Sequence, residues 1–158
     1  MSFTQWISDP SIELQDLTLA MKSRSYASGR RIYTFRIEQQ KFWLKFHEPN
    51  IHKGLEQAFQ RELEFYQENE KIHSNLLLPY QVVQFDQNTA FQSIVDQGQG
   101  LILLDVEPFF TDISQLKSLE AIQQKIITAL DRLNELHQLG WIHGDLKPDH
   151  FRQMDNAC

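Results

Sequence analysis

The stretch Arg31–Phe46, Arg-Ile-Tyr-Thr-Phe-Arg-Ile-Glu-Gln-Gln-Lys-Phe-Trp-Leu-Lys-Phe, decides the fold of the first half of the chain. Its two ends are rich in β-branched and aromatic residues, a composition that favours strands, and the polar residues Glu38–Gln40 separate them. We therefore predict that Arg31–Ile37 and Lys41–Phe46 form an antiparallel hairpin.

Strand signals continue on both sides of this hairpin. We predict a further strand near Leu17–Met21, joined to the hairpin by the loop Lys22–Arg30. Beyond Asn75, three more stretches have the composition of strands: Leu76–Phe85, Ala90–Val95 and Leu101–Leu104. Pro108 is expected to stop the last of these strands, because proline cannot donate a ladder hydrogen bond.

Two longer stretches have the periodicity of helices. In Gly54–Glu70, apolar residues recur at spacings of three and four and share one face: Leu55, Ala58, Phe59, Phe65 and Tyr66. Ala121–Leu139 is amphipathic, and Gly140 follows it as a C-cap residue would. A short helix is predicted just before it, at Ser114–Leu119. The order of strands, one helix, strands and then helices predicts an α+β fold, with a sheet-rich first half and a helical second half.

The composition limits the classes of function. At 158 residues the chain has the length of one domain with a real core. Its net charge of −6 argues against nucleic acid or an anionic membrane as the main partner. The single cysteine, Cys158, excludes an internal disulfide framework and fits a reducing compartment. Because no apolar run approaches the roughly 20 residues of a membrane span, we expect a cytoplasmic protein.

The residues that point to chemistry lie at Trp141–Phe151, which is Trp-Ile-His-Gly-Asp-Leu-Lys-Pro-Asp-His-Phe. Phosphoryl transfer needs a carboxylate that orients the acceptor hydroxyl and takes its proton, and a positive charge beside the transferring group. Asp145 and Lys147 would supply these groups, and His143 would pack and hydrogen-bond backbone to hold the loop. The alternative is a plain helix and turn with solvated charges, because Asp, Lys and Pro are common in turns.

The spacing His143-x-Asp145-x-Lys147 after a helix resembles the catalytic loop of protein kinases, His-Arg-Asp-Leu-Lys-Pro-x-Asn. Gly144 replaces the arginine here and His150 replaces the asparagine. The His-Gly-Asp core is similar to that of aminoglycoside phosphotransferases and small atypical bacterial kinases, whereas the following Leu-Lys-Pro is closer to protein kinases.

The resemblance implies one kinase-like domain over residues 1–158. An antiparallel-sheet N-lobe with one helix would occupy about 15–106. A hinge and an incomplete helical C-lobe would occupy about 107–158, with the catalytic loop at 142–151. It also implies ATP and Mg²⁺ as cofactors and transfer of the γ-phosphate to a hydroxyl of an unidentified protein or small molecule.

A kinase-like N-lobe requires a lysine on the third strand, which pairs with the α/β-phosphates, and a glutamate on the next helix, which holds it. Lys45 lies in a context that resembles the Val-Ala-Ile-Lys motif. On the helix Gly54–Glu70, Glu62 lies in the apolar stripe, where an unpaired carboxylate is costly. We therefore predict an ion pair between Lys45 and Glu62, with Glu64, on the polar face, as the fallback.

The resemblance also assigns the remaining nucleotide contacts. The loop Lys22–Arg30, with Ser28 and Gly29, corresponds to the nucleotide loop. The run Leu101–Leu104 and the following residues resemble the fifth strand and hinge, where backbone groups near Glu107 would read the adenine edge. A plain strand and turn is the alternative for this stretch.

Three features depart from the kinase pattern. The nucleotide loop holds one glycine in place of Gly-x-Gly-x-x-Gly. His150 stands where the metal-binding asparagine is expected, and imidazole suits Zn²⁺ better than Mg²⁺, so His150 either weakens the metal site or hydrogen-bonds a phosphate. The sequence reaches Cys158 without an Asp-Phe-Gly-like segment, so we expect impaired activity in this chain. Gly144 also argues against control by activation-loop phosphorylation, because no arginine is there to hold a phosphate.

Two other interpretations remain open. The chain could be a non-catalytic pseudokinase that senses a nucleotide or binds a partner. An incomplete C-lobe would expose the apolar face of Ala121–Leu139 and favour self-association or binding to another chain. The second possibility is an unrelated α+β domain, which would bind no nucleotide.

Overall fold

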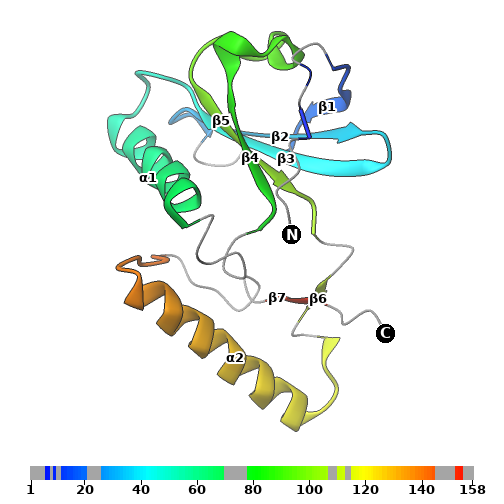
Figure 1. Cartoon of the computed structure of the whole chain (residues 1–158), viewed down its shortest axis with the longest axis vertical. Coiled ribbons are helices and arrows are strands. Elements are labelled where there is room, and N and C mark those ends of the chain that lie inside the picture. Colours follow the sequence, from blue (N-terminus) through cyan, green and yellow to red (C-terminus); the bar gives the residue numbers. More distant parts are fainter. Residues whose placement is uncertain are drawn as a thin grey trace. The chain divides into compact units, whose positions relative to one another are not determined.

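The computed structural model describes residues 6–7, 9, 12–20, 26–69, 78–106, 110–112, 115–144 and 152–154. The chain divides into two compact units, Met1–Asp105 and Val106–Cys158. Figure 1 shows sheet and helix in the first unit and a long helix in the second. The predicted α+β class is confirmed.

A five-stranded antiparallel sheet forms the first unit, in the order β1-β2-β3-β5-β4. Its strands are β1 (Gln15–Leu19), β2 (Arg30–Ile37), β3 (Gln40–His47), β4 (Tyr80–Gln84) and β5 (Gln99–Leu104). The predicted hairpin is confirmed: β2 pairs with β3, and Phe35 lies opposite Phe42. The fifth strand also lies where the apolar run predicted it.

One face of the sheet carries most of the aromatic core. Strand alternation turns Phe42, Leu44 and Phe46 to this face, and all three are buried. The ring of Phe35 stacks on that of Phe42 at 5.4 Å and meets the edge of Phe91 at 5.5 Å. Such aromatic pairs contribute about 0.5–1.5 kcal/mol each beyond the burial of their area. The first unit therefore has a hydrophobic core of its own.

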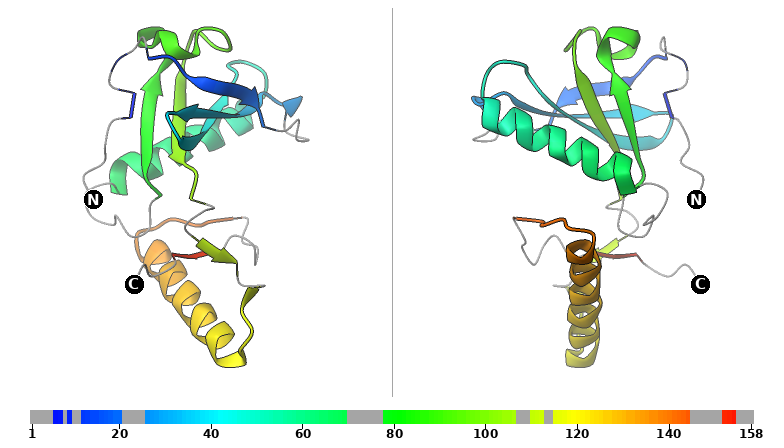
Figure 2. Two further views of the ribbon diagram at one scale, coloured as in Figure 1. Left: turned by 90° about the vertical axis from the view of Figure 1, so that its right-hand side faces the viewer. Right: turned by 60° about the vertical axis from the view of Figure 1, so that its left-hand side comes forward.

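Helix α1 (Lys53–Asn69) packs against the sheet and contacts β3 (Figure 2). Phe59, Leu63 and Tyr66, at spacings of four and three, are its buried residues. The Tyr80 hydroxyl donates to the Tyr66 carbonyl at 3.0 Å, which ties the end of α1 to β4. The predicted helix is confirmed, but two residues of its buried side differ from the prediction. Ala58 is exposed, and Leu63, which was not included, is buried.

The predicted strand Ala90–Val95 is wrong. The short 3₁₀ helices η2 (Phe85–Gln87) and η3 (Thr89–Phe91) and a turn occupy this region. The side chain of Asn88 accepts a hydrogen bond from the Ala90 N–H at 3.0 Å, as a helix cap does. Phe85 and Phe91 are buried without the alternation of a strand. Both rings pack in the hydrophobic core, so their burial comes from tertiary contacts and not from strand alternation.

The second unit contains a short antiparallel pair and one long helix. Strands β6 (Phe110–Asp112) and β7 (Arg152–Met154) pair with each other, which the sequence did not predict. Helix α2 (Leu119–Gln138) is the predicted amphipathic helix. Its end is followed by Gly140, whose φ of 83° lies in the left-handed region, as expected for a C-cap glycine.

The start of α2 corrects a second prediction. Residues 116–118 are not helical, so the short helix predicted at Ser114–Leu119 is absent over that part. Ser118 is instead the N-cap of α2, and its hydroxyl accepts from the Ala121 N–H at 3.1 Å. No helix in the described part of the chain is long and apolar enough to cross a membrane.

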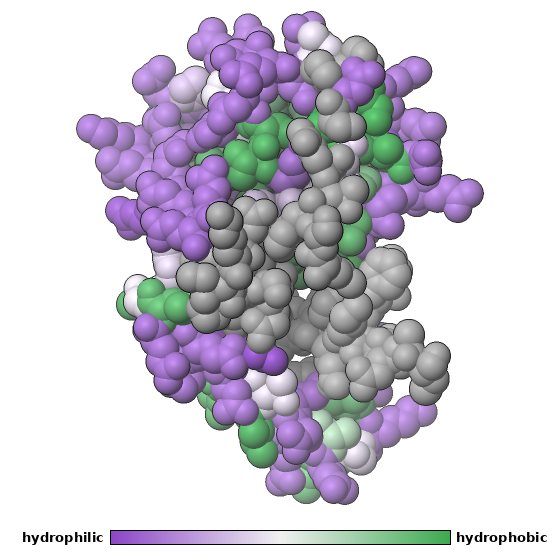
Figure 3. Space-filling view, in the orientation of Figure 1, coloured by the Kyte–Doolittle hydropathy of each residue, from purple (hydrophilic) through white to green (hydrophobic). Residues whose placement is uncertain are grey.

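The coloured surface in Figure 3 is mostly hydrophilic, with a few apolar residues among the polar ones. On α2, several large apolar side chains are exposed, and they are Leu119, Ile126, Ile127 and Leu130. The two units therefore differ in how far they bury their apolar residues.

Candidate functional site

The candidate site begins with an ion pair between Lys45 on β3 and Glu62 on α1, in which the lysine Nζ donates to the glutamate Oε1. Strand alternation turns Leu44 and Phe46 into the core and Lys45 to the opposite side. The side chains of Lys45 and Glu62 are 24% and 27% exposed, so the pair is partly buried and still accessible to a ligand. The predicted ion pair is confirmed.

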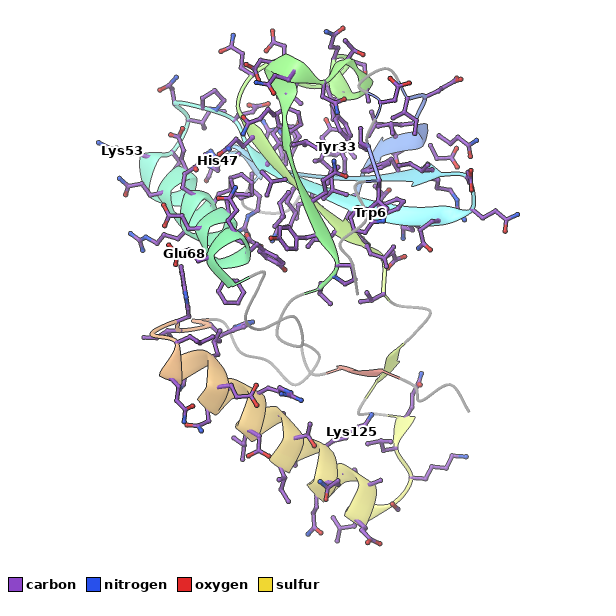
Figure 4. All side chains as sticks on the ribbon, in the orientation of Figure 1. Trp6, Tyr33, His47, Lys53, Glu68 and Lys125 are labelled. Carbon is purple, nitrogen blue, oxygen red and sulfur yellow. The ribbon has the colours of Figure 1, made fainter. Side chains whose placement is uncertain are left out.

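The position of Glu62 on α1 explains why it, and not Glu64, makes this pair. Glu62 lies beside the buried stripe of the helix and is half-buried, whereas Glu64 is exposed. Burial raises the pKa of Tyr66 well above its ordinary value of 10.0, and the nearby charge of Glu62 raises it further. Glu62 and Tyr66 are four residues apart on α1, so their side chains share one side of the helix. Lys53 and Glu68, at the two ends of the same helix, are exposed (Figure 4).

A turn before β2 belongs to the same end of the sheet as Lys45. Ile32 pairs with Lys45 across the hairpin, and Gly29 precedes Ile32 by three residues, a separation of about 10 Å along a strand. The Gly29 N–H donates to the Tyr26 carbonyl at 3.1 Å, and the Gly29 carbonyl accepts from the Glu48 N–H at 2.8 Å. The turn is thus joined to the end of β3, and Ser28 within it is half-buried.

Gly29 is required by its surroundings. Its φ is 95°, and a Cβ added there would lie 2.8 Å from Cε1 of His47 and 3.1 Å from Cβ of Ile51. A side chain would meet both an unfavourable backbone conformation and a steric clash. The sequence singled out Gly29 as a nucleotide-loop residue; the geometry shows why a glycine is needed, and its contact with nucleotide stays a prediction.

Arg31 fixes this turn, and the sequence interpretation missed it. Its Nε and Nη2 donate to the two carboxylate oxygens of Glu48 at 3.0 and 2.9 Å, and its Nη1 donates to the carbonyls of Tyr26 and Arg30. The guanidinium carbon also lies 3.8 Å from the centre of the Tyr26 ring. Arg31 and Phe35 are four residues apart on β2, so they point to the same buried side of the strand. An arginine at such a position needs a partner, and this was the signal in the sequence that could have identified it. We call this set, Arg31 with Glu48 and Tyr26, the arginine clamp.

A second lysine–carboxylate pair lies near the other end of β3. The Nζ of Lys41 is 3.5 Å from Oδ2 of Asp105, and the Asp105 N–H donates to the Lys41 carbonyl at 3.0 Å. The same Nζ lies 4.7 Å from the centre of the Trp43 ring. Asp105 is buried and is the last residue of the first unit. No pattern in the sequence singled out this pair.

Several predicted site residues fall outside the described part of the chain: Glu107, Asp145, Lys147 and His150. His143 is described in the second unit and is exposed, and its role in holding the loop stays a prediction. The structure brings together Lys45 and Glu62, with Ser28 and Gly29 at the same end of the hairpin. The approach of Asp145 to that pair stays a prediction.

The described residues contain no cluster of metal ligands. Among the described residues, no group of three or more His, Cys, Asp or Glu side chains could hold a metal ion. We therefore assign no ligands for Mg²⁺ in that part of the chain. His150 lies outside it.

In comparisons with known proteins, no protein-family model, no curated protein and no solved structure matches this chain.

Proposed function

We propose that the chain is a kinase-like, ATP-dependent phosphotransferase in which Lys45 and Glu62 position the phosphates of the nucleotide. The observation that carries the proposal is the ion pair itself. A catalytic-loop resemblance at Trp141–Phe151 demands a lysine on the third strand and a glutamate on the following helix, far away in the sequence. Lys45 is on the third strand and Glu62 on the next helix, and they are paired.

The chemistry of the pair suits this role. A lysine ammonium has three N–H donors, so it can hold the Glu62 carboxylate and phosphate oxygens at once. Glu62 fixes the direction of Lys45 before the nucleotide arrives, which reduces the ordering that binding requires. The partial exposure of both side chains leaves the ammonium within reach of a ligand.

The remaining steps fall to residues of the catalytic-loop resemblance. Asp145 would accept the proton of the acceptor hydroxyl as its oxygen attacks the γ-phosphorus, and ADP would leave. Lys147 would lie beside the γ-phosphate oxygens, where negative charge is spread in the transition state. Mg²⁺ would neutralise charge on the phosphates when bound, and His150 and the backbone at Glu107 keep their predicted roles toward phosphate and adenine.

The Lys45 part of the proposal is tested by nucleotide affinity. Lys45→Ala is expected to weaken Mg²⁺–ATP binding at least about tenfold, or about 1.4 kcal/mol, in isothermal titration calorimetry. Lys53→Ala, which removes an exposed lysine from α1, is the matched control and should leave affinity unchanged. Equal affinities for wild type and the Lys45 variant would count against the proposal.

The catalytic part is tested separately by phosphoryl transfer. With γ-labelled ATP, Asp145→Asn should abolish transfer of label to water or an added hydroxyl acceptor while ATP binding persists. If the wild type binds ATP at Lys45 and transfers no phosphate, the chain is the non-catalytic, nucleotide-binding alternative. If it binds no ATP, the unrelated α+β domain is the better description.

A further inference from the structure

A polar hollow of about 140 Å³ lies on the sheet, near the turn of the β2–β3 hairpin. Six described residues of β1, β2 and β3 line it: Asp16, Thr18, Thr34, Phe35, Arg36 and Lys41. Lys45 lies four residues beyond Lys41 on β3, about 13 Å away between Cα atoms, and is not part of this lining. The hollow is therefore separate from the ion pair at which the proposed function holds the phosphates of a nucleotide.

Two cationic side chains of the hollow face each other. Arg36 lies directly opposite Lys41 in the β2–β3 ladder, and like charges at such positions destabilise a sheet. Lys41 is compensated by Asp105, which is buried and whose Oδ2 lies 3.5 Å from the lysine Nζ. Arg36 donates from Nη2 to the Gln39 carbonyl at 2.7 Å, and within the described ranges it forms no ion pair. The guanidinium therefore keeps its charge and most of its five N–H donors for a ligand.

A carboxylate lies in the same hollow without neutralising this arginine. The β-bulge between Gln15 and Thr18 takes Asp16 out of the ladder, and the φ of Asp16 is 53°, in the left-handed region that aspartate tolerates. Asp16 and Arg36 both line the hollow, yet they form no ion pair with each other. The hollow thus presents a negative group and a positive group that are separated and not paired.

These separated charges decide which ligands fit. A simple anion, including a polyphosphate, is attracted by Arg36 and repelled by Asp16, and a simple cation meets the reverse. A ligand that carries both a carboxylate and an ammonium group satisfies both residues, because a guanidinium binds a carboxylate through paired N–H donors and an aspartate accepts from an ammonium. The hydroxyls of Thr18 and Thr34, which lie 3.2 Å apart, add neutral hydrogen-bonding groups.

The size of the hollow narrows the choice further. Pockets that enclose a drug-sized ligand have volumes of about 300–1,000 Å³. A volume of about 140 Å³ corresponds to roughly five water molecules at about 30 Å³ each, which is room for a small metabolite. We propose that this hollow binds a small α-amino acid, with its carboxylate at Arg36 and its ammonium group at Asp16. This inference goes beyond the proposed function and does not depend on it.

L-Serine is the probe, because its hydroxyl can hydrogen-bond to the two threonines. 3-Hydroxypropanoate lacks only the ammonium group of serine, and ethanolamine lacks only the carboxylate. Binding of each compound to the full chain is followed in nitrogen–proton NMR correlation spectra, in which weak affinities are measurable and the shifted amides locate the ligand. Serine should saturably shift the amides around Thr18 and Thr34. It should bind at least about tenfold more tightly than either analogue, because each analogue leaves one charge of the hollow unpaired.

Two variants test the assigned orientation of the ligand. Asp16→Asn keeps a residue that tolerates the left-handed conformation, and it should weaken serine binding about tenfold without weakening 3-hydroxypropanoate binding. Arg36→Gln should weaken serine binding about tenfold without weakening ethanolamine binding. Lys41 is left in place, because its removal would leave the buried Asp105 without this partner.

Controls separate this inference from the proposed function. Glu38→Gln, in the exposed turn between β2 and β3, and Lys45→Ala should both leave serine affinity unchanged, and thermal unfolding checks that each variant folds. The amino-acid assignment is overturned if serine causes no saturable shift around the hollow, if either analogue binds as tightly as serine, or if both charge variants bind serine as wild type does. A wild type that binds serine in this way and binds no ATP would support this inference and overturn the proposed function.

Discussion

Helices α1 and α2 have similar lengths, 17 and 20 residues, and both are amphipathic, yet they differ in what covers their apolar side. On α1, Leu63 is 1% exposed, and Phe59 and Tyr66 are also buried. None of the residues of α2 is buried, and Leu130 is 57% exposed. Periodicity therefore predicts that a helix forms and which side is apolar, but it does not predict whether that side is covered.

This difference bears on the candidate site. Glu62 is next to Leu63 in the sequence, so the packing of α1 on the sheet sets the position of the carboxylate that holds Lys45. The first unit thus contains both the core and the ion pair that depends on it. The residues that resemble a catalytic loop follow α2, on which Leu119, Ile126, Ile127 and Leu130 are exposed.

The largest expected effect comes from removing a buried side chain of α1. Leu63→Ala should lower the free energy of unfolding by about 2–5 kcal/mol, because it leaves a cavity where a fully buried leucine packed. Leu130→Ala on α2 is the matched control and should change it by less than about 0.5 kcal/mol. Urea unfolding followed by circular dichroism measures both. Equal losses for the two variants would show that α2 is covered in solution.

Two glycines extend the comparison to the backbone. Gly29 and Gly140 both have positive φ, 95° and 83°, but only Gly29 has atoms close to the site of an added Cβ. In both alanine variants the free energy of unfolding should fall by about 1 kcal/mol, because alanine disfavours the left-handed conformation. Gly29→Ala should lose more, because the new Cβ would meet His47, and the arginine clamp would have to shift. Thermal unfolding of the two variants is the measurement, and a larger loss at Gly140 would contradict the packing of the turn.

The smallest effect is a dependence on alkaline pH. Burial, aided by the charge of Glu62, raises the pKa of Tyr66 in the folded state above its unfolded value of 10.0. The unfolded chain therefore loses this proton first, and stability should fall as pH rises above about 10, by at most about 1.4 kcal/mol per pH unit. Tyr66→Phe should reduce that slope, measured by urea unfolding between pH 9 and 11. A slope identical in wild type and variant would show that Tyr66 is not the titrating group.

Local pattern was sufficient for much of the fold. The hairpin, the fifth strand and both long helices follow from alternation and periodicity, and the choice of Glu62 over Glu64 follows from helical spacing. These features depend on contacts between near neighbours in sequence or on the energetic cost of an unpaired carboxylate.

Features that depend on distant contacts were not predicted. Phe85 and Phe91 lie in segments with the composition of strands, but both residues are in short 3₁₀ helices and their rings are buried in the core. Arg31 and Lys41 have the alternation of ordinary strand residues, and only the fold reveals Glu48 and Asp105 beside them. A residue type at a strand position does not identify its partner when many partners are available.

A double-mutant cycle on Lys45 and Glu62, with Mg²⁺–ATP affinity measured by calorimetry, tests the central claim most directly. Glu62→Gln should weaken binding about tenfold in wild type and have almost no further effect in the Lys45→Ala background, because the glutamate acts through the lysine. Glu64→Gln is the matched control on the exposed side of the same helix. Equal effects of Glu62→Gln in both backgrounds, or none in either, would contradict the account.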